Sequence, residues 1–131
     1  MKHFYLSPLI ILYLLPGVSF VDPIDEVAQL IRQGNIHELS KMFSPNIEIT
    51  ILDEENVYSK AQAELILDKF FSQNKPRAVK ILHKISSNPN YRFAVLIVNT
   101  DKGPYRVAYT LKATGGNLMM TDIQIDREMV K

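Results

Sequence analysis

The chain has 131 residues, which suits one domain and is too short for two. Its 15 basic and 14 acidic residues give a formal net charge of +1, without the basic excess that a nucleic-acid-binding protein shows. It contains no cysteine, which excludes thiol catalysis, disulfides and cysteine-based zinc sites, so the core alone must hold the fold.

The first 19 residues have the pattern of a secretory signal peptide. A basic start at Lys2 precedes the apolar run FYLSPLIILYLLPGV, and small residues follow up to Ser19. Because this run is shorter than the roughly 20 residues of a membrane-spanning helix and contains two prolines, the pattern favours a cleaved signal over an anchor. We expect cleavage after Ser19, which leaves residues 20–131 as one exported domain, periplasmic or secreted, with no membrane span.

Capping residues and apolar spacing predict the first two helices. Asp22-Pro23 combines an N-cap with proline at the first helical position, and that helix should end at Gly34. Asn35 caps a second short helix, which Ser44-Pro45 should stop. Their buried faces are expected to consist of Ile24, Val27, Ala28 and Ile31 in the first helix, and Ile36, Leu39 and Phe43 in the second.

A strand and a third helix follow. The alternation in NIEITIL, residues 46–52, predicts a half-buried strand. Ser59 and Gln62 form the two ends of a capping box, so a helix should begin at about Lys60, and Pro76 lies beyond its end. Its buried stripe is predicted to be Ala63, Ile66, Leu67 and Phe70.

Three consecutive acids, Asp53, Glu54 and Glu55, separate this strand from the third helix. Adjacent side chains on a turn diverge, and neither a histidine nor a further acid lies nearby in sequence to complete a metal shell. We therefore interpret the acids as a solvated turn, expect no metal and no cofactor, and do not assign the functional site to them.

The C-terminal half is predicted to form four strands, at residues 77–87, 91–100, 104–114 and 117–128. The intervening NPN, DKG and GG are turn signals, and such short connections force antiparallel hairpins. The predicted fold class is therefore α+β. A curved antiparallel sheet, made of this four-stranded meander and the N-terminal strand, carries three helices on its concave face.

The order of elements, together with QGNIHELSKMF, IEITILDEENVYSKAQAELILDKFF and KILHKI, resembles the nuclear transport factor 2-like superfamily, a cystatin-like cone. More closely, the chain is similar to a small family of exported bacterial proteins of unknown function. The similarity covers roughly residues 22–128 and is most specific in VYSKAQAE and the following FF. It implies the fold and a place in the bacterial envelope, but it brings no established activity and no catalytic residue.

Turn geometry sets an expected register for the C-terminal strands. Three-residue NPN and DKG loops and a two-residue GG turn pair His83 with Val95, Val95 with Tyr109, and Tyr109 with Asp122. We assign this row to the concave face, because that face would carry the larger side chains. A cone-shaped pocket for a small apolar ligand is then predicted, lined by Phe70, His83, Phe93, Tyr105, Tyr109, Asp122 and Gln124.

The sequence is compatible with three functions. The preferred hypothesis is an exported, non-catalytic ligand-binding or protein-interaction module. The first alternative is a ketosteroid-isomerase-like enzyme, with Asp122 as the base and Tyr109 or His83 polarising a carbonyl. The second is a purely structural envelope protein, in which Tyr109 donates its hydroxyl to Asp122.

The opposite face of the sheet is predicted to be an interface. Its central row is apolar, charged residues surround it, and helices cover only the other side of the sheet. The expected partner is an envelope protein or a second copy of the chain, which would give a homodimer. The contact residues are predicted to be Leu82, Leu96, Val98, Ala108 and Ile123.

Overall fold

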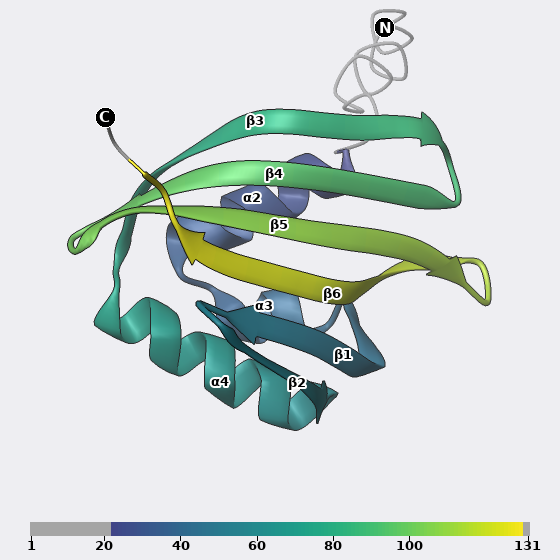
Figure 1. Ribbon diagram of the computed structural model, residues 1–131. Helices are drawn as coiled ribbons and strands as arrows, with labels where there is room; N and C mark the ends of the chain where they lie inside the picture. The colour runs from purple at the N-terminus through teal and green to yellow at the C-terminus, as the bar shows by residue number, and fades with distance from the viewer. Residues whose placement is uncertain (1–21, 130–131) are drawn as a thin grey trace, which may run out of the picture.

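The computed structural model describes residues 22–129, which form three helices and one six-stranded sheet (Figure 1). The sheet is curved and open, with strand order β2-β1-β6-β5-β4-β3, and its only parallel neighbours are β1 and β6. The predicted α+β class is confirmed. In chain order the elements are α2 (Pro23–Gln33), α3 (Ile36–Ser40), β1 (Phe43–Ile51), β2 (Glu54–Ser59), α4 (Lys60–Gln73), β3 (Pro76–Asn88), β4 (Tyr91–Thr100), β5 (Gly103–Thr114) and β6 (Asn117–Arg127).

The predicted capping residues set the helix ends. The Asp22 carboxylate accepts the Ile24 N–H at 2.8 Å at the start of α2, and Gly34 ends that helix in the left-handed conformation, at φ 70°. The Ser59–Gln62 capping box is complete, so α4 begins at Lys60 as the sequence predicts. Both helices therefore start where local hydrogen bonding satisfies their free N–H groups.

The second helix is shorter than predicted. Helix α3 ends at Ser40, and Phe43 is the first residue of β1 rather than part of a helix face. Phe43 is fully buried and pairs with Met120 of β6. A short helix contributes little stability on its own, so the burial of Phe43 against β6 determines the local conformation.

Strand β2 is not predicted by the sequence pattern, which assigns its first two residues, Glu54 and Glu55, to a solvated turn. The turn between β1 and β2 contains only Leu52 and Asp53, while Glu54 and Glu55 already pair with Ile51 and Thr50. The pairing of β1 with β2 continues without a register shift as far as Ser59. The three acids thus occupy the tip and the first residues of a hairpin.

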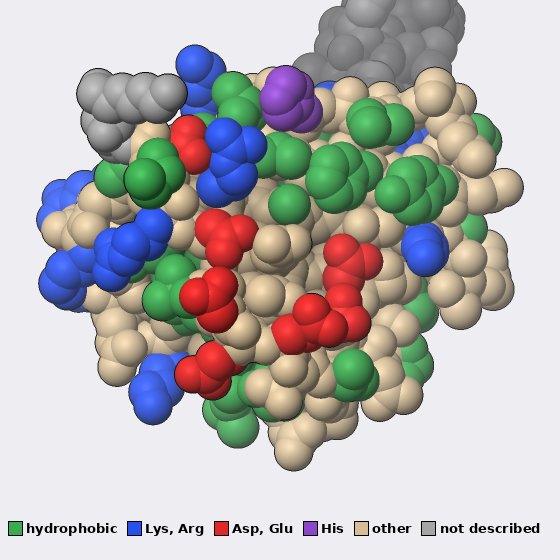
Figure 2. Space-filling view, in the orientation of Figure 1, with side chains coloured by type: hydrophobic (Ala, Val, Ile, Leu, Met, Phe, Trp, Pro, Cys, Tyr) green, Lys and Arg blue, Asp and Glu red, His purple; other side chains and the backbone are tan. Residues whose placement is uncertain are grey.

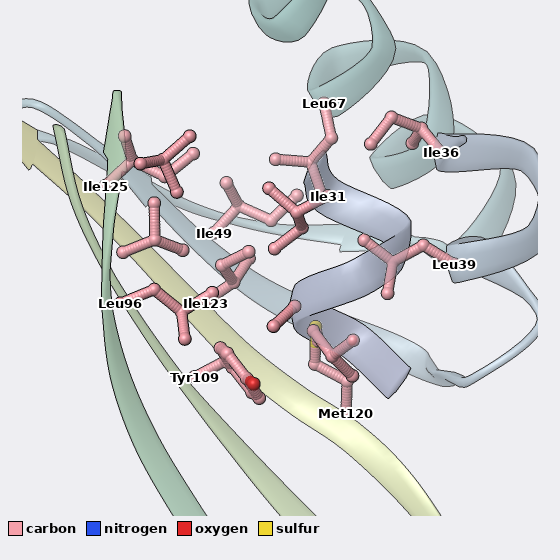
Figure 3. Packing of buried hydrophobic residues seen from close by; sticks show 14 of the residues in the cluster. Ile31, Ile36, Leu39, Ile49, Leu67, Leu96, Tyr109, Met120, Ile123 and Ile125 are labelled. Carbon is pink, nitrogen blue, oxygen red and sulfur yellow. The ribbon is translucent and has the colours of Figure 1, made fainter. Parts of the chain in front are cut away.

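The core lies between the inner face of the sheet and the helices. Helix α2 packs against β3 and β4, α4 packs against β1 and β2, and α3 contacts both helices. Figure 3 shows Leu96, Tyr109, Ile123 and Ile125 pointing from the sheet toward α2. The largest fully buried side chains are Tyr109, Phe43, Ile24, Ile31, Ile36, Leu39, Ile47, Ile49, Leu67, Leu96, Leu111 and Met120.

The predicted register is correct where His83 and Ile85 pair with β4, is shifted by a bulge on either side of them, and is wrong for the later strands. His83 pairs with Val95, as expected. The loop between β4 and β5 has two residues rather than three, so Val95 pairs with Ala108 instead of Tyr109. A bulge at Thr121 then shifts β6 by one residue, after which Tyr109 pairs with Ile123 and not with Asp122.

These shifts correct the face assignment, because a slip of one residue moves each side chain to the other face. Leu96 points into the core and is 0% exposed, whereas Val95 lies on the outer face, outside the core cluster. In the part of the chain that the structure describes, no helix combines the length and the apolar character needed to cross a bilayer.

Candidate functional site

The residues predicted to line a cone-shaped pocket lie on two different faces of the sheet. Phe70, Tyr105 and Tyr109 belong to the core or pack against it. The other four, His83, Phe93, Asp122 and Gln124, lie on the outer face. His83 and Gln124 share a row with Val95 and Ala108, and Phe93 and Asp122 lie in the next row of the same face. The structure therefore does not bring the predicted set together in one cavity.

Tyr109 has a structural partner within the core. Its hydroxyl donates a hydrogen bond of 2.8 Å to the main-chain carbonyl of Ile24 and so ties the sheet to α2. Burial raises the pKa of the Tyr109 hydroxyl far above its usual range, and the nearby charges of Asp25 and Asp22 add to this effect. Tyr109 thus acts as a neutral donor to a helix that packs on the sheet.

Asp122, the predicted base, lies away from this phenol. Its carboxylate accepts hydrogen bonds of 3.0 Å from the hydroxyls of Thr110 and Thr121 on the outer side of the sheet. Tyr109 and Asp122 are on opposite faces, so they cannot contact one substrate together. Tyr105 is also engaged, because its hydroxyl donates to the Asn74 side chain at 3.0 Å.

The predicted interface residues are likewise divided. Leu96, Val98 and Ile123 are buried in the core, because β4 and β6 present the opposite face from the one expected. Ala108 does lie on the outer face, next to Val95. Leu82 is exposed at a bulge in β3, between the residues that pair with Leu96 and Val95.

The outer face nevertheless carries a contiguous apolar area, which we call the outer patch. Ile85 pairs with Phe93, and Val95 with Ala108, in adjacent rows of one face. Figure 2 shows hydrophobic side chains gathered over β3 and β4 on this side of the molecule. Ile85 is 51% exposed. The outer patch consists of Ile85, Phe93, Val95, Ile97 and Ala108.

An acidic area borders the outer patch. The same rows continue onto β6, β1 and β2, where four carboxylates share the outer face. Figure 2 shows acidic side chains gathered below the apolar group, over β6 and β1. Among residues 22–129, no Lys, Arg or His lies within ion-pairing distance of these carboxylates. This acidic stripe consists of Glu48, Glu55, Asp122 and Asp126.

A hollow of about 450 Å³ lies beneath the β1–β2 hairpin, beside α4. Its lining is mostly apolar, with two acids at the hairpin tip: Ile49, Ile51, Leu52, Asp53, Glu54, Tyr58 and Ile66. A second hollow of about 270 Å³ shares Tyr58 and Ile66 and extends along α4 to Leu65 and Lys69. We call the two together the β2–α4 groove.

This groove is not predictable from the sequence pattern. The pattern indicates that Asp53 and Glu54 are solvated, and it gives no strand for the residues that follow them. The usual local signal is missing, because a tight two-residue hairpin favours glycine or asparagine and this chain has Leu52 there. Leu52 adopts φ 57°, a left-handed conformation that costs a non-glycine residue about 1 kcal/mol. Its N–H donates to the Ile125 carbonyl at 2.8 Å, which helps hold it in place.

Two polar clusters elsewhere connect helices to their neighbours. Lys84 of β3 forms an ion pair of 2.8 Å with Asp22 at the start of α2, and a second of 3.3 Å with Asp25. Burial is the largest single effect and would raise the pKa of Asp22, but the hydrogen bonds from Lys84 and from the Ile24 N–H, together with the charges of Lys84 and Arg92, outweigh it, so the pKa is lowered. The cluster anchors the first turn of α2 to the sheet.

The second cluster joins α3 to α4. Glu64 accepts a hydrogen bond from the Ser40 hydroxyl at 3.0 Å and lies 3.0 Å from the His37 ring. The contact with His37, followed by that with Ser40, lowers the pKa of Glu64. Ser40 also donates to the His37 carbonyl, but its hydroxyl has no contact with the His37 ring, so the three residues do not form a nucleophile–base pair. No group of His, Asp or Glu residues within 22–129 has a geometry suited to a metal ion.

The chain has a fold similar to that of nuclear transport factor 2-like proteins. A protein of unknown function with that fold from Cytophaga hutchinsonii is similar, with a TM-score of 0.56 and 11% identity over 88% of this chain and 95% of that chain. A domain of unknown function with a cystatin-like fold from Nostoc punctiforme has a TM-score of 0.63 and 7% identity, over 79% of this chain and 72% of that chain. The predicted resemblance is therefore confirmed at the level of the fold.

The chain belongs to the family described as a domain of unknown function, DUF4783, whose profile matches residues 24–126. The crystal structure of a DUF4783 family protein from Bacteroides uniformis is similar, with a TM-score of 0.78 and 22% identity. That similarity covers 83% of this chain and 100% of the other. No curated protein matches the sequence. Family membership thus assigns the fold and leaves the function to be argued from the site.

Proposed function

We propose that the protein is an exported, non-catalytic interaction module that binds a second copy of itself through the outer patch. The main support is the apolar surface that stays open on the outer face: Ile85 is 51% exposed, and Phe93 and Ile97 are partly exposed beside it, with no helix of residues 22–129 packed over them. An apolar centre on a sheet face that no helix covers is typical of an interface.

The arrangement of charge supports a self-complementary contact. Lys80 lies on the outer face of β3, on one side of the outer patch, and the acidic stripe lies on the other. A two-fold axis parallel to the strands and lying between β4 and β5 would place β4 of each copy over the partner's β5, and β3 over the partner's β6, the nearest strand of the acidic stripe. Opposite charges would then meet at both borders of the contact.

The division of the predicted pocket supports a non-catalytic role. Tyr109 is bonded to the backbone of α2, and Asp122 is bonded to two threonine hydroxyls on the opposite face. A base and an electrophile must both reach one substrate, which these positions do not allow. The hypothesis of a small apolar ligand in the cone loses support for the same reason, since its lining residues do not share a cavity.

The export part of the proposal rests on residues 1–19, which lie outside the described residues. Their basic start, apolar run and small residues have the composition of a signal peptide. We expect protein from the envelope fraction to begin within a few residues of Phe20, as measured by N-terminal sequencing. Recovery of an intact Met1 from that fraction would contradict the export proposal.

Light scattering on the purified chain tests the interface. We expect a dimer at micromolar concentration and a folded monomer for Phe93→Glu, which places like charges near the two-fold axis. Leu65→Glu is the matched control, because Leu65 is well exposed on α4, far from the outer patch, and should leave the dimer intact. A monomeric parent chain at high concentration would refute the proposal.

A further inference from the structure

The free edge of β2 is available for strand addition. In a hairpin with a two-residue loop, the residues that flank the loop exchange both main-chain hydrogen bonds, and these pairs alternate along the strand. Glu54, Asn56 and Tyr58 therefore bond to β1. The N–H and C=O groups of Glu55 and Val57 point away from the sheet, and no strand within residues 22–129 pairs with them.

The other edge strand of the sheet, β3, is less suited to strand addition. The pairing of β3 with β4 has three register shifts, and bulges of this kind twist an edge away from regular pairing. Strand β2 pairs with β1 without any shift, so its free edge is regular, and Val57 on it is 65% exposed. An unprotected, regular edge is a template for an additional strand.

The two sides of this edge differ in chemistry. On the inner side, Tyr58 and Glu54 face the β2–α4 groove, whose lining is mainly apolar. On the outer side, Glu55 and Val57 share a face with Glu48 and the rest of the acidic stripe. A strand laid along β2 would place alternate side chains in the groove and over the acids.

We propose that the β2 edge binds an extended segment of a partner protein in which apolar residues alternate with Lys or Arg. The apolar side chains would enter the β2–α4 groove, and the cations would lie over Glu55 and Glu48. Main-chain hydrogen bonds to Glu55 and Val57 would supply affinity, and the alternation would supply specificity.

A second copy of β2 fits this edge poorly. Its own sequence, EENVYS, would bring Glu54 and Glu55 to a region that is already acidic, and it offers few apolar side chains for the groove. The proposal concerns a surface separate from the outer patch, so it goes beyond the proposed function and does not depend on dimerisation there.

The probe is the labelled synthetic peptide Lys-Val-Lys-Ile-Lys-Val. Its controls are Lys-Lys-Lys-Val-Ile-Val, which has the same composition without alternation, and Glu-Val-Glu-Ile-Glu-Val, which reverses the charge. Fluorescence anisotropy measures affinity, and amide hydrogen exchange of Glu55 and Val57 reports pairing at the edge. We expect the alternating peptide to bind at low salt and to protect both amides, and each control to bind at least about tenfold more weakly.

Variants of the chain separate the contributions of main-chain pairing and of charge to peptide binding. Val57→Pro removes an outward-pointing N–H that β1 does not use, so it should keep the fold and weaken binding about tenfold. Glu55→Gln should weaken binding a few-fold and reduce its dependence on salt. Glu26→Gln, at an exposed position on α2, is the matched control and should change neither affinity nor salt dependence.

Three outcomes would overturn the proposal. Equal binding of the charge-reversed peptide would remove the role of the acidic stripe, and binding without protection of Glu55 and Val57 would remove strand addition. Protection of these amides in the free protein, rising with concentration and unchanged in Phe93→Glu, would make a second copy the occupant. Phe93 lies on the outer patch, which is separate from the β2 edge. The peptide-binding result at the β2 edge can therefore be interpreted even if the chain is a monomer.

Discussion

Two adjacent residues of β4 give the sharpest test of the sheet's two faces. Leu96 is fully buried between the sheet and the helices, with Tyr109 and Ile123 nearby (Figure 3), whereas Val95 lies on the outer face. Leu96→Ala removes three carbons from a packed core and leaves a cavity, so it should lower the free energy of unfolding by about 3 kcal/mol. Val95→Ala removes two methyl groups from a side chain that neighbouring side chains cover but no helix packs against, so solvent can fill the space left and the cost should be about 1 kcal/mol.

Urea unfolding followed by circular dichroism measures both changes. A difference of about 2 kcal/mol separates the two midpoints by about 2 M at an m-value near 1 kcal/mol per M. The measurement is repeated over a range of protein concentrations, because a dimer through the outer patch adds a concentration-dependent term to the stability of the parent chain. If Val95→Ala costs as much as Leu96→Ala at the lowest concentration, the face assignment is wrong.

Three further predictions concern local features. Ser59→Ala removes the capping acceptor of α4 and should cost about 1 kcal/mol in chemical unfolding; an unchanged midpoint would mean that the cap contributes nothing. Leu52→Gly relieves the left-handed strain and should be at least as stable as Leu52→Val, whose branched side chain resists that conformation; the reverse order in thermal unfolding would show that Leu52 is not strained. The folded-state pKa of Glu64 lies below its ordinary value of 4.5, so its stabilising contact is complete above that pH and is lost as pH falls through the lowered pKa. Acid should therefore destabilise the parent chain more than Glu64→Gln, and parallel losses in the two proteins would contradict this.

Features that depend on a few neighbouring residues were predictable from the sequence. The caps at Asp22 and Ser59 and the left-handed Gly34 lie where expected, because each satisfies backbone groups within one turn of the chain. The alternation of β1 and the turns between the C-terminal strands also predicted the elements and their antiparallel order. These signals are local, so the α+β class followed from them.

The two faces of the sheet depended on interactions between distant segments. The sequence RFAVLIVNT in β4 is apolar at both odd and even positions, so its pattern does not say which side faces the helices. One residue fewer in the loop before β5 and one bulge at Thr121 then exchange the roles of Leu96 and Val95 and separate Tyr109 from Asp122.

Contacts between distant segments of the chain also determine the candidate sites. The groove exists because α4 packs under β1 and β2 and leaves the end of the hairpin open, and the β2 edge is free because β1 takes β6 as its other neighbour. The sequence shows the residues of the groove and of the edge, but the packing of distant segments determines which of these residues come into contact. Local periodicity contains no information about that packing, since the burial that stabilises it comes from residues far apart in the chain.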